Sequence, residues 1–318
     1  MRVWQNFMIS LARNAGIKNF MQIRRSMSRL ATRFVGGSIV DEVIEKGKIF
    51  KSGNIRASLY YLGEYVDDEA KINQTVSALK EITKRLAESN LDIHVSVDPT
   101  QIGYLIDKDK CTGNILEIAI LLNNYATAAN NELKNLLMLD MEDSSNIDFT
   151  LELYRKFRNQ SIPVAVTLQA YLHRTGKDLE MILESGGSVR LVKGAFTESK
   201  KIAFGSRSVI DDNYLKLVEM MLSDKARDKG FYPIFGTHDD KIITRIIETA
   251  NKRGWEKGSY EFELLYGVRT DLQNELIKKG ERLRLYLPFG VDWWPYAVRR
   301  IGESAKNARF LFRSILNN

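Results

Sequence analysis

A short apolar run followed by a longer helical pattern recurs along this chain, and this alternation limits the fold more than any single motif. The apolar runs have the length of strands and lie at Ala57–Leu62, Asp92–Val97, Leu136–Met141, Pro163–Leu168, Val189–Val192, Tyr232–Phe235, Glu261–Leu265 and Leu283–Leu287. The helical patterns that follow them lie at Glu69–Ser89, Gly113–Asn130, Ile147–Asn159, Lys177–Glu184, Asp211–Lys229, Asp239–Lys252, Asp271–Lys279 and Pro295–Leu316. Strands that alternate with helices predict a parallel sheet covered by helices.

The regularity of these strand–helix units favours a closed barrel over an open, doubly wound sheet. An open sheet seldom needs so many units, and this sequence lacks the glycine-rich first turn that a dinucleotide-binding sheet normally carries. We therefore predict an α/β fold, a (βα)8 TIM-type barrel at residues 56–318 with an N-terminal helical extension at residues 1–55. Within the barrel, Thr270 and Gln273 form a capping-box pattern, and Gly254 and Gly280 stand where glycines commonly end helices.

The residue types present exclude several kinds of site. A single cysteine, Cys111, excludes an intramolecular disulfide and suits a reducing compartment. The histidines at positions 94, 173 and 238 are scattered without ligand spacing, so we predict no metal centre. No apolar run approaches the length of a membrane span, which is about 20 residues.

The positive charge of the chain, a net +7, is concentrated near the N-terminus, where no acidic residue occurs before Asp41. Three interpretations compete for this basic segment: an organellar transit peptide, an amphipathic helix on anionic lipid with Trp4, Phe7 and Met8 on its apolar side, or a docked helix with a solvated basic face. We predict a retained, docked helical extension whose basic surface meets a membrane. Basic residues elsewhere are interleaved with acidic ones, which argues against nucleic acid as a partner.

A barrel of this type places its catalytic groups at the C-terminal ends of the strands. The residues at or just beyond the predicted strand ends are mostly polar or ionisable, and they are Glu64, Asp98, Asp140 with Glu142, Gln169, Lys193, His238, Leu265 and Tyr286. Polar groups in such number need partners if they are buried. We therefore predict a deep polar pocket at one mouth of the barrel.

The helix after the last strand carries Tyr296, Arg299, Arg300 and Glu303 at spacings that place them on roughly one face. Paired arginines beside aromatic residues suit a small carboxylate ligand, because a guanidinium binds a carboxylate with two parallel hydrogen bonds. The alternative is a solvated helix with an ion pair between Arg299 and Glu303.

Several segments together resemble the monofunctional proline dehydrogenases, a family of flavin enzymes with a distorted (βα)8 barrel. The similarity begins near Arg29 and includes 33–37, Tyr61–Glu64, Leu139–Asp143, Arg190–Phe196, Gly236–Asp239, Phe262–Arg269 and Arg284–Glu303. Each segment alone is weak evidence. Their shared order, with most of them at predicted strand ends, makes the resemblance specific.

The resemblance implies FAD, bound without a Rossmann fold. The positions that match flavin-contacting residues of the family are Gln169, Arg190, Val192, Lys193, Gly194, Ala195, Arg207, Thr237 and His238. Cations beside the flavin stabilise its anionic reduced ring, and tuning of this kind is what a protein contributes to hydride transfer. A lysine at a barrel strand end can also form a Schiff base, but Arg190 and Gln169 argue against that role for Lys193.

The resemblance also implies the substrate site. Arg299 and Arg300 match the carboxylate-binding pair, and Glu303 matches the residue that orients one of them. The other implied contacts are Tyr286 and Tyr296 against the substrate ring, Leu265 as an apolar wall, Glu64 as a gate that pairs with an arginine, and Asp140 in the active-site network. The residues that we expect to carry catalysis are Lys193, Asp140, Tyr286, Arg299, Arg300 and Glu303.

Two positions depart from the family pattern. Asp98 stands where the family has a lysine that helps to hold the substrate carboxylate, and Phe196 stands where a tyrosine is usual. A reversed charge beside an anionic ligand can cost several kcal/mol. This change weakens the expectation that the substrate is L-proline itself.

The reaction implied is oxidation of L-proline, or a close cyclic amine, to the cyclic imine Δ1-pyrroline-5-carboxylate, with a hydride passed to flavin N5 and electrons passed on to a quinone. One alternative is a flavin enzyme that acts on a different secondary or cyclic amine because of Asp98. Another is a non-catalytic homologue that binds a ligand or a flavin. The expected location is the cytoplasm or the cytoplasmic side of the inner membrane, or the mitochondrion in a eukaryote.

Overall fold

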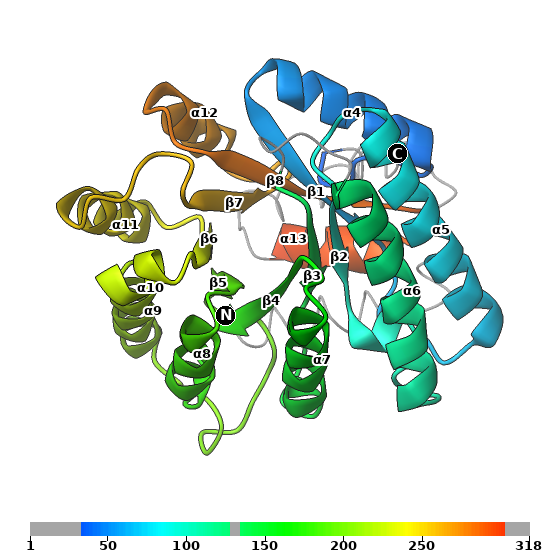
Figure 1. Ribbon diagram of the computed structural model, residues 1–318, viewed down its shortest axis with the longest axis horizontal. Helices are drawn as coiled ribbons and strands as arrows, with labels where there is room; N and C mark the ends of the chain where they lie inside the picture. Colours follow the sequence, from blue (N-terminus) through cyan, green and yellow to red (C-terminus); the bar gives the residue numbers. More distant parts are fainter. Residues whose placement is uncertain (1–32, 128–133, 303–318) are drawn as a thin grey trace, which may run out of the picture.

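The computed structural model describes residues 33–127 and 134–302, and it shows a closed barrel of parallel strands with helices arranged around it (Figure 1). The strands are β1 (Ile55–Tyr61), β2 (His94–Val97), β3 (Leu136–Leu139), β4 (Val164–Gln169), β5 (Ser188–Val192), β6 (Tyr232–Gly236), β7 (Glu261–Leu265) and β8 (Leu283–Phe289). Each strand pairs with the next in the chain, and β8 closes the ring on β1. The predicted (βα)8 TIM-type barrel is confirmed.

Helices follow the strands in the predicted order. The described helices are α4 (Val40–Ser52), α5 (Glu69–Glu88), η1 (Pro99–Gln101), α6 (Lys108–Thr127), α7 (Ile147–Asn159), α8 (Thr175–Glu184), α9 (Arg207–Met221), α10 (Asp224–Asp228), α11 (Asp240–Lys252), α12 (Thr270–Lys278) and α13 (Trp294–Gly302). The predicted extension is described only from residue 33 onward, where α4 packs against β1 and α5. Among the described residues, no helix is both long and apolar enough to cross a membrane.

Two local predictions are wrong and two are confirmed. The helix predicted at Asp211–Lys229 is two helices, because the hydroxyl of Ser223 accepts a hydrogen bond from the Ala226 amide and starts α10. Thr270 does not cap α12, since the residue before that helix is Arg269, whose φ is 52°. Gly254 and Gly280 have φ of 68° and 71° just beyond α11 and α12, as predicted for helix-ending glycines.

The interior of the barrel has an apolar side and a charged side. The apolar side comes from β3, β4 and β6, and its residues are Leu136, Met138, Ala165, Tyr232 and Ile234. The charged side comes from β7, β8, β1 and β2, where Arg284 is fully buried between Glu261 and Asp92. All strands are parallel, so their C-terminal ends form a single rim, and the pairing of β1 with β8 is continuous from Ile55 to Tyr61.

Candidate active site

Arg299 lies at the C-terminal rim of the barrel and is held by a carboxylate. It comes from α13, whose Trp294, Tyr296 and Val298 pack with Tyr60 of β1. Glu64, in the loop after β1, accepts two parallel hydrogen bonds from the guanidinium, one of them with Nη1···Oε2 of 2.6 Å. Burial opposes the charge on Arg299, but the Glu64 carboxylate raises the pKa of this arginine above its ordinary value.

Arg300 is the next residue of the same helix, and its charge acts on His238, beyond β6. Its guanidinium lies 5.4 Å from the ring centre of Tyr296, which is one helical turn earlier and buried. Burial, followed by the charges of Arg300 and Arg269, lowers the pKa of His238 to about 4. Arg299 therefore lies near the loop after β1, and Arg300 lies within electrostatic range of His238, two residues beyond β6.

Asp140 and Arg190 form a buried ion pair beneath these arginines. Asp140 follows β3 and also accepts hydrogen bonds from the hydroxyls of Thr167 (2.9 Å) and Tyr286 (3.1 Å). Arg190 of β5 also donates to Glu263 of β7, with Nη1···Oε1 of 2.8 Å. The network connects strands on several sides of the barrel, so it fixes the Tyr286 hydroxyl and the Arg190 guanidinium in one arrangement.

Two tyrosines form an aromatic wall over this network. Tyr60 and Tyr286 stack with ring centres 5.5 Å apart and planes inclined by 27°. The guanidinium carbon of Arg190 lies 5.1 Å from the Tyr286 ring centre. Burial, followed by the charge of Asp98, raises the pKa of Tyr286 well above its ordinary value, so its hydroxyl stays protonated.

Asp98 is buried directly after β2, and the hydroxyl of Tyr60 donates to its Oδ2 at 2.7 Å. Burial, followed by the charge of Glu64, raises the pKa of Asp98 to about 7. Glu142 is buried nearby and accepts hydrogen bonds from the Thr100 amide (3.0 Å) and hydroxyl. Burial, followed by the charge of Asp98, raises the pKa of Glu142 to about 8. Burial therefore favours the protonated form of both carboxyl groups at the mouth.

The residues predicted to hold a cofactor lie along the other side of the rim. Gln169 ends β4 and donates through Nε2 to the carbonyls of Met141 (2.7 Å) and Glu142 (3.0 Å). Its Oε1 is buried without a hydrogen-bond partner in the described part of the chain. Lys193 follows β5 and pairs with Asp239 (2.9 Å) and Asp211 (2.5 Å).

The remaining predicted cofactor residues differ in exposure. Gly194 has φ of 107°, and a Cβ at this position would lie 2.1 Å from the ring of Tyr171, so only glycine fits. Val192, the last residue of β5, is partly buried, and Thr237, just beyond β6, is buried. Ala195, just after β5, and Arg207, at the start of α9, are exposed. Leu265 ends β7, and its amide donates to Nε2 of His238 at 3.0 Å, which fixes a neutral ring with its proton on Nδ1.

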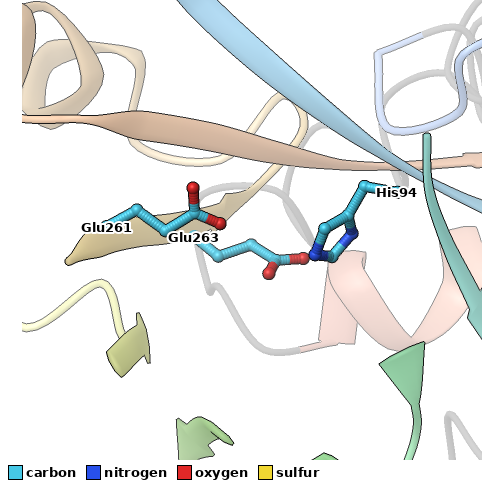
Figure 2. A group of neighbouring side chains, drawn as sticks. All are labelled: His94, Glu261 and Glu263. Carbon is cyan, nitrogen blue, oxygen red and sulfur yellow. The ribbon is translucent and has the colours of Figure 1, made fainter. Parts of the chain in front are cut away.

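Among residues 33–127 and 134–302, one group in the barrel interior offers ligand atoms that could surround a metal. His94, Glu261 and Glu263 bring one ligand atom each within 4.8 Å of one another, and Figure 2 shows the His94 ring beside the Glu263 carboxylate. Arg284 and Arg282 already occupy the oxygens of Glu261. Burial, followed by the charges of nearby arginines, lowers the pKa of His94 well below its ordinary value. The arginines that pair with Glu261 and Glu263 would compete with a cation for the same carboxylate oxygens.

Several members of the site were not predicted from the sequence. Tyr60, Thr167, Glu263 and Asp239 hold predicted residues in place, as the bonds above show. The alternation of inward and outward side chains along a strand could have identified Tyr60 and Glu263, which share a face with Ser58 and Leu265. Glu303 lies outside the described residues.

Comparisons with known proteins agree with this architecture. A family model described as proline dehydrogenase matches residues 43–313. Proline dehydrogenase 2 of Bacillus subtilis strain 168 is 31% identical over 313 residues, which cover 98% of this chain and 99% of the relative. The proline dehydrogenase of Deinococcus radiodurans is 31% identical over 295 residues, which cover 92% of each chain.

Among solved structures, proline utilization A from Bdellovibrio bacteriovorus, inactivated by N-propargylglycine, superposes with a TM-score of 0.78. The match covers 88% of this chain and 33% of that longer protein, at 21% sequence identity. At this identity the likeness supports the fold alone.

Proposed function

The chain belongs to the proline dehydrogenase family of oxidoreductases, which act on the CH–NH group of their donors, and on this premise we propose that it oxidises L-proline or a close cyclic amino acid. Membership in the family also implies a flavin cofactor and a small amino acid as substrate. The product would be the cyclic imine, Δ1-pyrroline-5-carboxylate when the substrate is L-proline.

One observation carries the proposal: a carboxylate already sits on Arg299. The two parallel hydrogen bonds from this half-buried guanidinium to Glu64 are those that an amino acid's carboxylate would accept in its place. Beneath this position lie the stacked rings of Tyr60 and Tyr286, which offer an apolar surface of the right kind for an aliphatic ring. Glu64 would then act as a gate that leaves Arg299 when substrate enters.

Catalysis on this arrangement is positioning and electrostatics rather than covalent attack. Arg299 and Arg300 would orient the substrate carboxylate, while Tyr286, Tyr296 and Leu265 would confine its ring. Asp140 holds the hydroxyl of Tyr286 and the guanidinium of Arg190 in place. Lys193 would contribute a positive charge near the cofactor, and Glu303 would orient one of the two arginines.

The residues at the rim fit a flavin. The unpartnered Oε1 of Gln169 can accept a hydrogen bond from a ring N–H. Arg190 and Lys193, each paired with two carboxylates, would donate N–H groups to the ring. A bound flavin would supply the acceptor for the hydride, at its N5. We propose FAD rather than FMN because α9 begins at Arg207 and has no acidic residue in its first turn, which suits a diphosphate.

Two further proposals concern the rest of the chain. Residues 1–55 form an N-terminal extension and residues 56–318 form the catalytic barrel. The basic charge before Asp41 would bring the enzyme to an anionic membrane, where a quinone takes the electrons. Co-sedimentation with liposomes should then require anionic lipid and decrease with added salt, and binding that ignores salt would remove the membrane role.

The decisive experiment for the reaction uses the colour of the flavin. The purified protein should show flavin absorption, release FAD on denaturation, and bleach under anaerobic conditions when L-proline is added. A panel of other cyclic and secondary amines tests whether Asp98 has changed the substrate. A colourless protein that also fails to take up added FAD would contradict the proposal. A yellow protein that no amine reduces would indicate a non-catalytic homologue.

A further inference from the structure

Three carboxyl groups at the mouth, those of Glu64, Asp98 and Glu142, lie within electrostatic range of one another. Of these three, Glu64 forms an ion pair with Arg299. Asp98 and Glu142 are 8% and 2% exposed, and the hydrogen bonds that the structure gives them come from neutral groups of Tyr60, Thr100 and the side chain of residue 146. Among the described residues neither of these two carboxyls has an ion-pair partner, and burial of a carboxyl without such a partner favours its protonated form.

The position of Glu64 indicates where a ligand carboxylate would bind, since the Glu64 carboxylate accepts the hydrogen bonds of the Arg299 guanidinium. Glu64 is the strongest charged neighbour of Asp98. Tyr60, whose hydroxyl bonds to Asp98, packs in one cluster with Tyr296 and Val298 of α13, so a ligand carboxylate on the same guanidinium would lie close to Asp98. An ionised Asp98 would repel it, whereas a protonated Asp98 could donate a hydrogen bond to it.

We propose that Asp98 holds a proton when a carboxylate ligand occupies Arg299, and that its neutral carboxyl accepts from Tyr60 while donating that proton to the ligand carboxylate. This inference rests on the proposed function, because it names the group that recognises the amino acid's carboxylate. It makes Asp98 a determinant of substrate binding. A lysine at this position would bind the carboxylate through its positive charge, whereas Asp98 would bind it through a neutral, protonated carboxyl. The bond formed is one hydrogen bond, and the proton comes from solvent.

The groups that face Asp98 come from every side of the mouth. They are Tyr60 of β1, Glu64 of the following loop, Glu142 after β3, Arg190 of β5, Tyr286 of β8 and Arg299 of α13. Burial and Glu64 raise the pKa of Asp98 to about 7, while the hydrogen bond from Tyr60 and the charges of Arg299 and Arg190 act in the other direction.

A bound carboxylate adds a negative charge, whereas the displaced Glu64 stays attached to the chain. The pKa of Asp98 should therefore be higher in the complex than in the free protein. Binding then takes up a proton, and ligand affinity falls as the pH rises above about 7.

The test is the pH dependence of binding of cyclopentanecarboxylate, a five-membered ring carboxylate with no titratable nitrogen. Calorimetry on the flavin-loaded protein, at pH 6.5 and 8.5 and in two buffers of different ionisation enthalpy, gives both the Kd and the protons taken up. We expect the Kd to rise about tenfold between these two pH values, with close to one proton taken up per ligand near pH 8.

Two variants identify the titrating group. Asp98→Asn is neutral at every pH, so its Kd should not change with pH and should be about tenfold below that of the parent at pH 8.5. Glu142→Gln is the matched control, because it removes the other buried carboxyl and should keep the pH dependence. The flavin spectrum of each variant checks that the barrel is intact.

Three outcomes would overturn the inference. They are a parent Kd that does not change between pH 6.5 and 8.5, a pH dependence that persists in Asp98→Asn, or one that is lost only in Glu142→Gln. A different failure, no binding of the probe at any pH even by Asp98→Asn, would remove the carboxylate site itself and with it the proposed function.

Discussion

Two clusters of arginine and carboxylate occupy opposite ends of this barrel, and they differ in how their charges are balanced. At the N-terminal ends of the strands, Arg284 is fully buried and pairs with Asp92 (2.7 Å) and Glu261 (2.6 Å), while donating to the carbonyl of Ala57 (2.8 Å). At the mouth, Arg299 is 33% exposed and pairs only with Glu64 among the described residues. The same pairing chemistry therefore serves two purposes.

The difference lies in what happens when a partner leaves. The oxygens of Glu261 are also occupied by Arg282 and Tyr232, so no water or ligand can replace Arg284 without leaving a buried charge. At the mouth, solvent reaches Arg299 and Glu64, and a ligand carboxylate can exchange with the side chain. The inner cluster fixes the closure of the barrel between β7, β8 and β2, and the outer cluster is available for binding.

The largest expected effect comes from breaking the inner cluster. Arg284→Leu removes the main partner of two buried carboxylates, so we expect the free energy of unfolding to fall by about 3–5 kcal/mol. Arg299→Leu should lower it by less than about 1 kcal/mol, because its partner Glu64 can turn to solvent. Urea denaturation of both variants measures the difference, and equal losses would show that the two clusters do not differ in this way.

Substrate binding should depend on the arginines at the mouth. Arg299→Lys and Arg300→Lys keep the charge but lose the planar fork, so the Kd for L-proline should rise about ten- to a hundredfold, which corresponds to ~1.4–3 kcal/mol. Flavin content should hardly change. If Arg300→Lys binds and turns over substrate like the parent, Arg300 does not bind the substrate carboxylate.

The sequence predicts the elements and rim residues of this barrel better than it predicts the partners that hold them. The barrel, its rim residues and Gly254 and Gly280 follow from local patterns, because strand alternation and helix-ending glycines depend on neighbouring residues. The partners do not: Tyr60 meets Asp98, which is 38 positions away, and Ser58 meets Glu263, which is 205 positions away. Such pairs depend on strand register around the closed barrel, which no local pattern contains.

The sequence does not predict the break between α9 and α10, for a related reason. Helical periodicity continues across Leu222, which is buried, so hydrophobic spacing alone predicts one helix. The capping hydroxyl of Ser223 decides the structure instead.

The shift in the pKa of Asp98 could not be predicted either, since it requires the burial and the neighbouring Glu64 that only the fold supplies.

The smallest expected effect tests the charge balance of the two ends through the pH dependence of stability. Burial acts to raise the pKa of Asp92, but Arg284 outweighs it and lowers this pKa below its ordinary value. The stability that Asp92 contributes is therefore present above about pH 4 and is lost as the pH falls through its lowered pKa. For Asp98 the pKa is raised to about 7, so its contribution has the opposite slope: it is present below about pH 4 and is lost as the pH rises through about 7.

Asp98→Asn should therefore match the parent in free energy of unfolding near pH 4 and exceed it by about 1–2 kcal/mol at pH 8, because the amide never ionises. We expect less than the full value of the pKa shift because water can enter the mouth of the barrel and solvate an ionised Asp98. Urea denaturation at about pH 4, 6 and 8 measures the trend. A variant that is less stable than the parent at pH 8 would mean that Asp98 is ionised and stabilised there, and that the mouth is balanced like the interior.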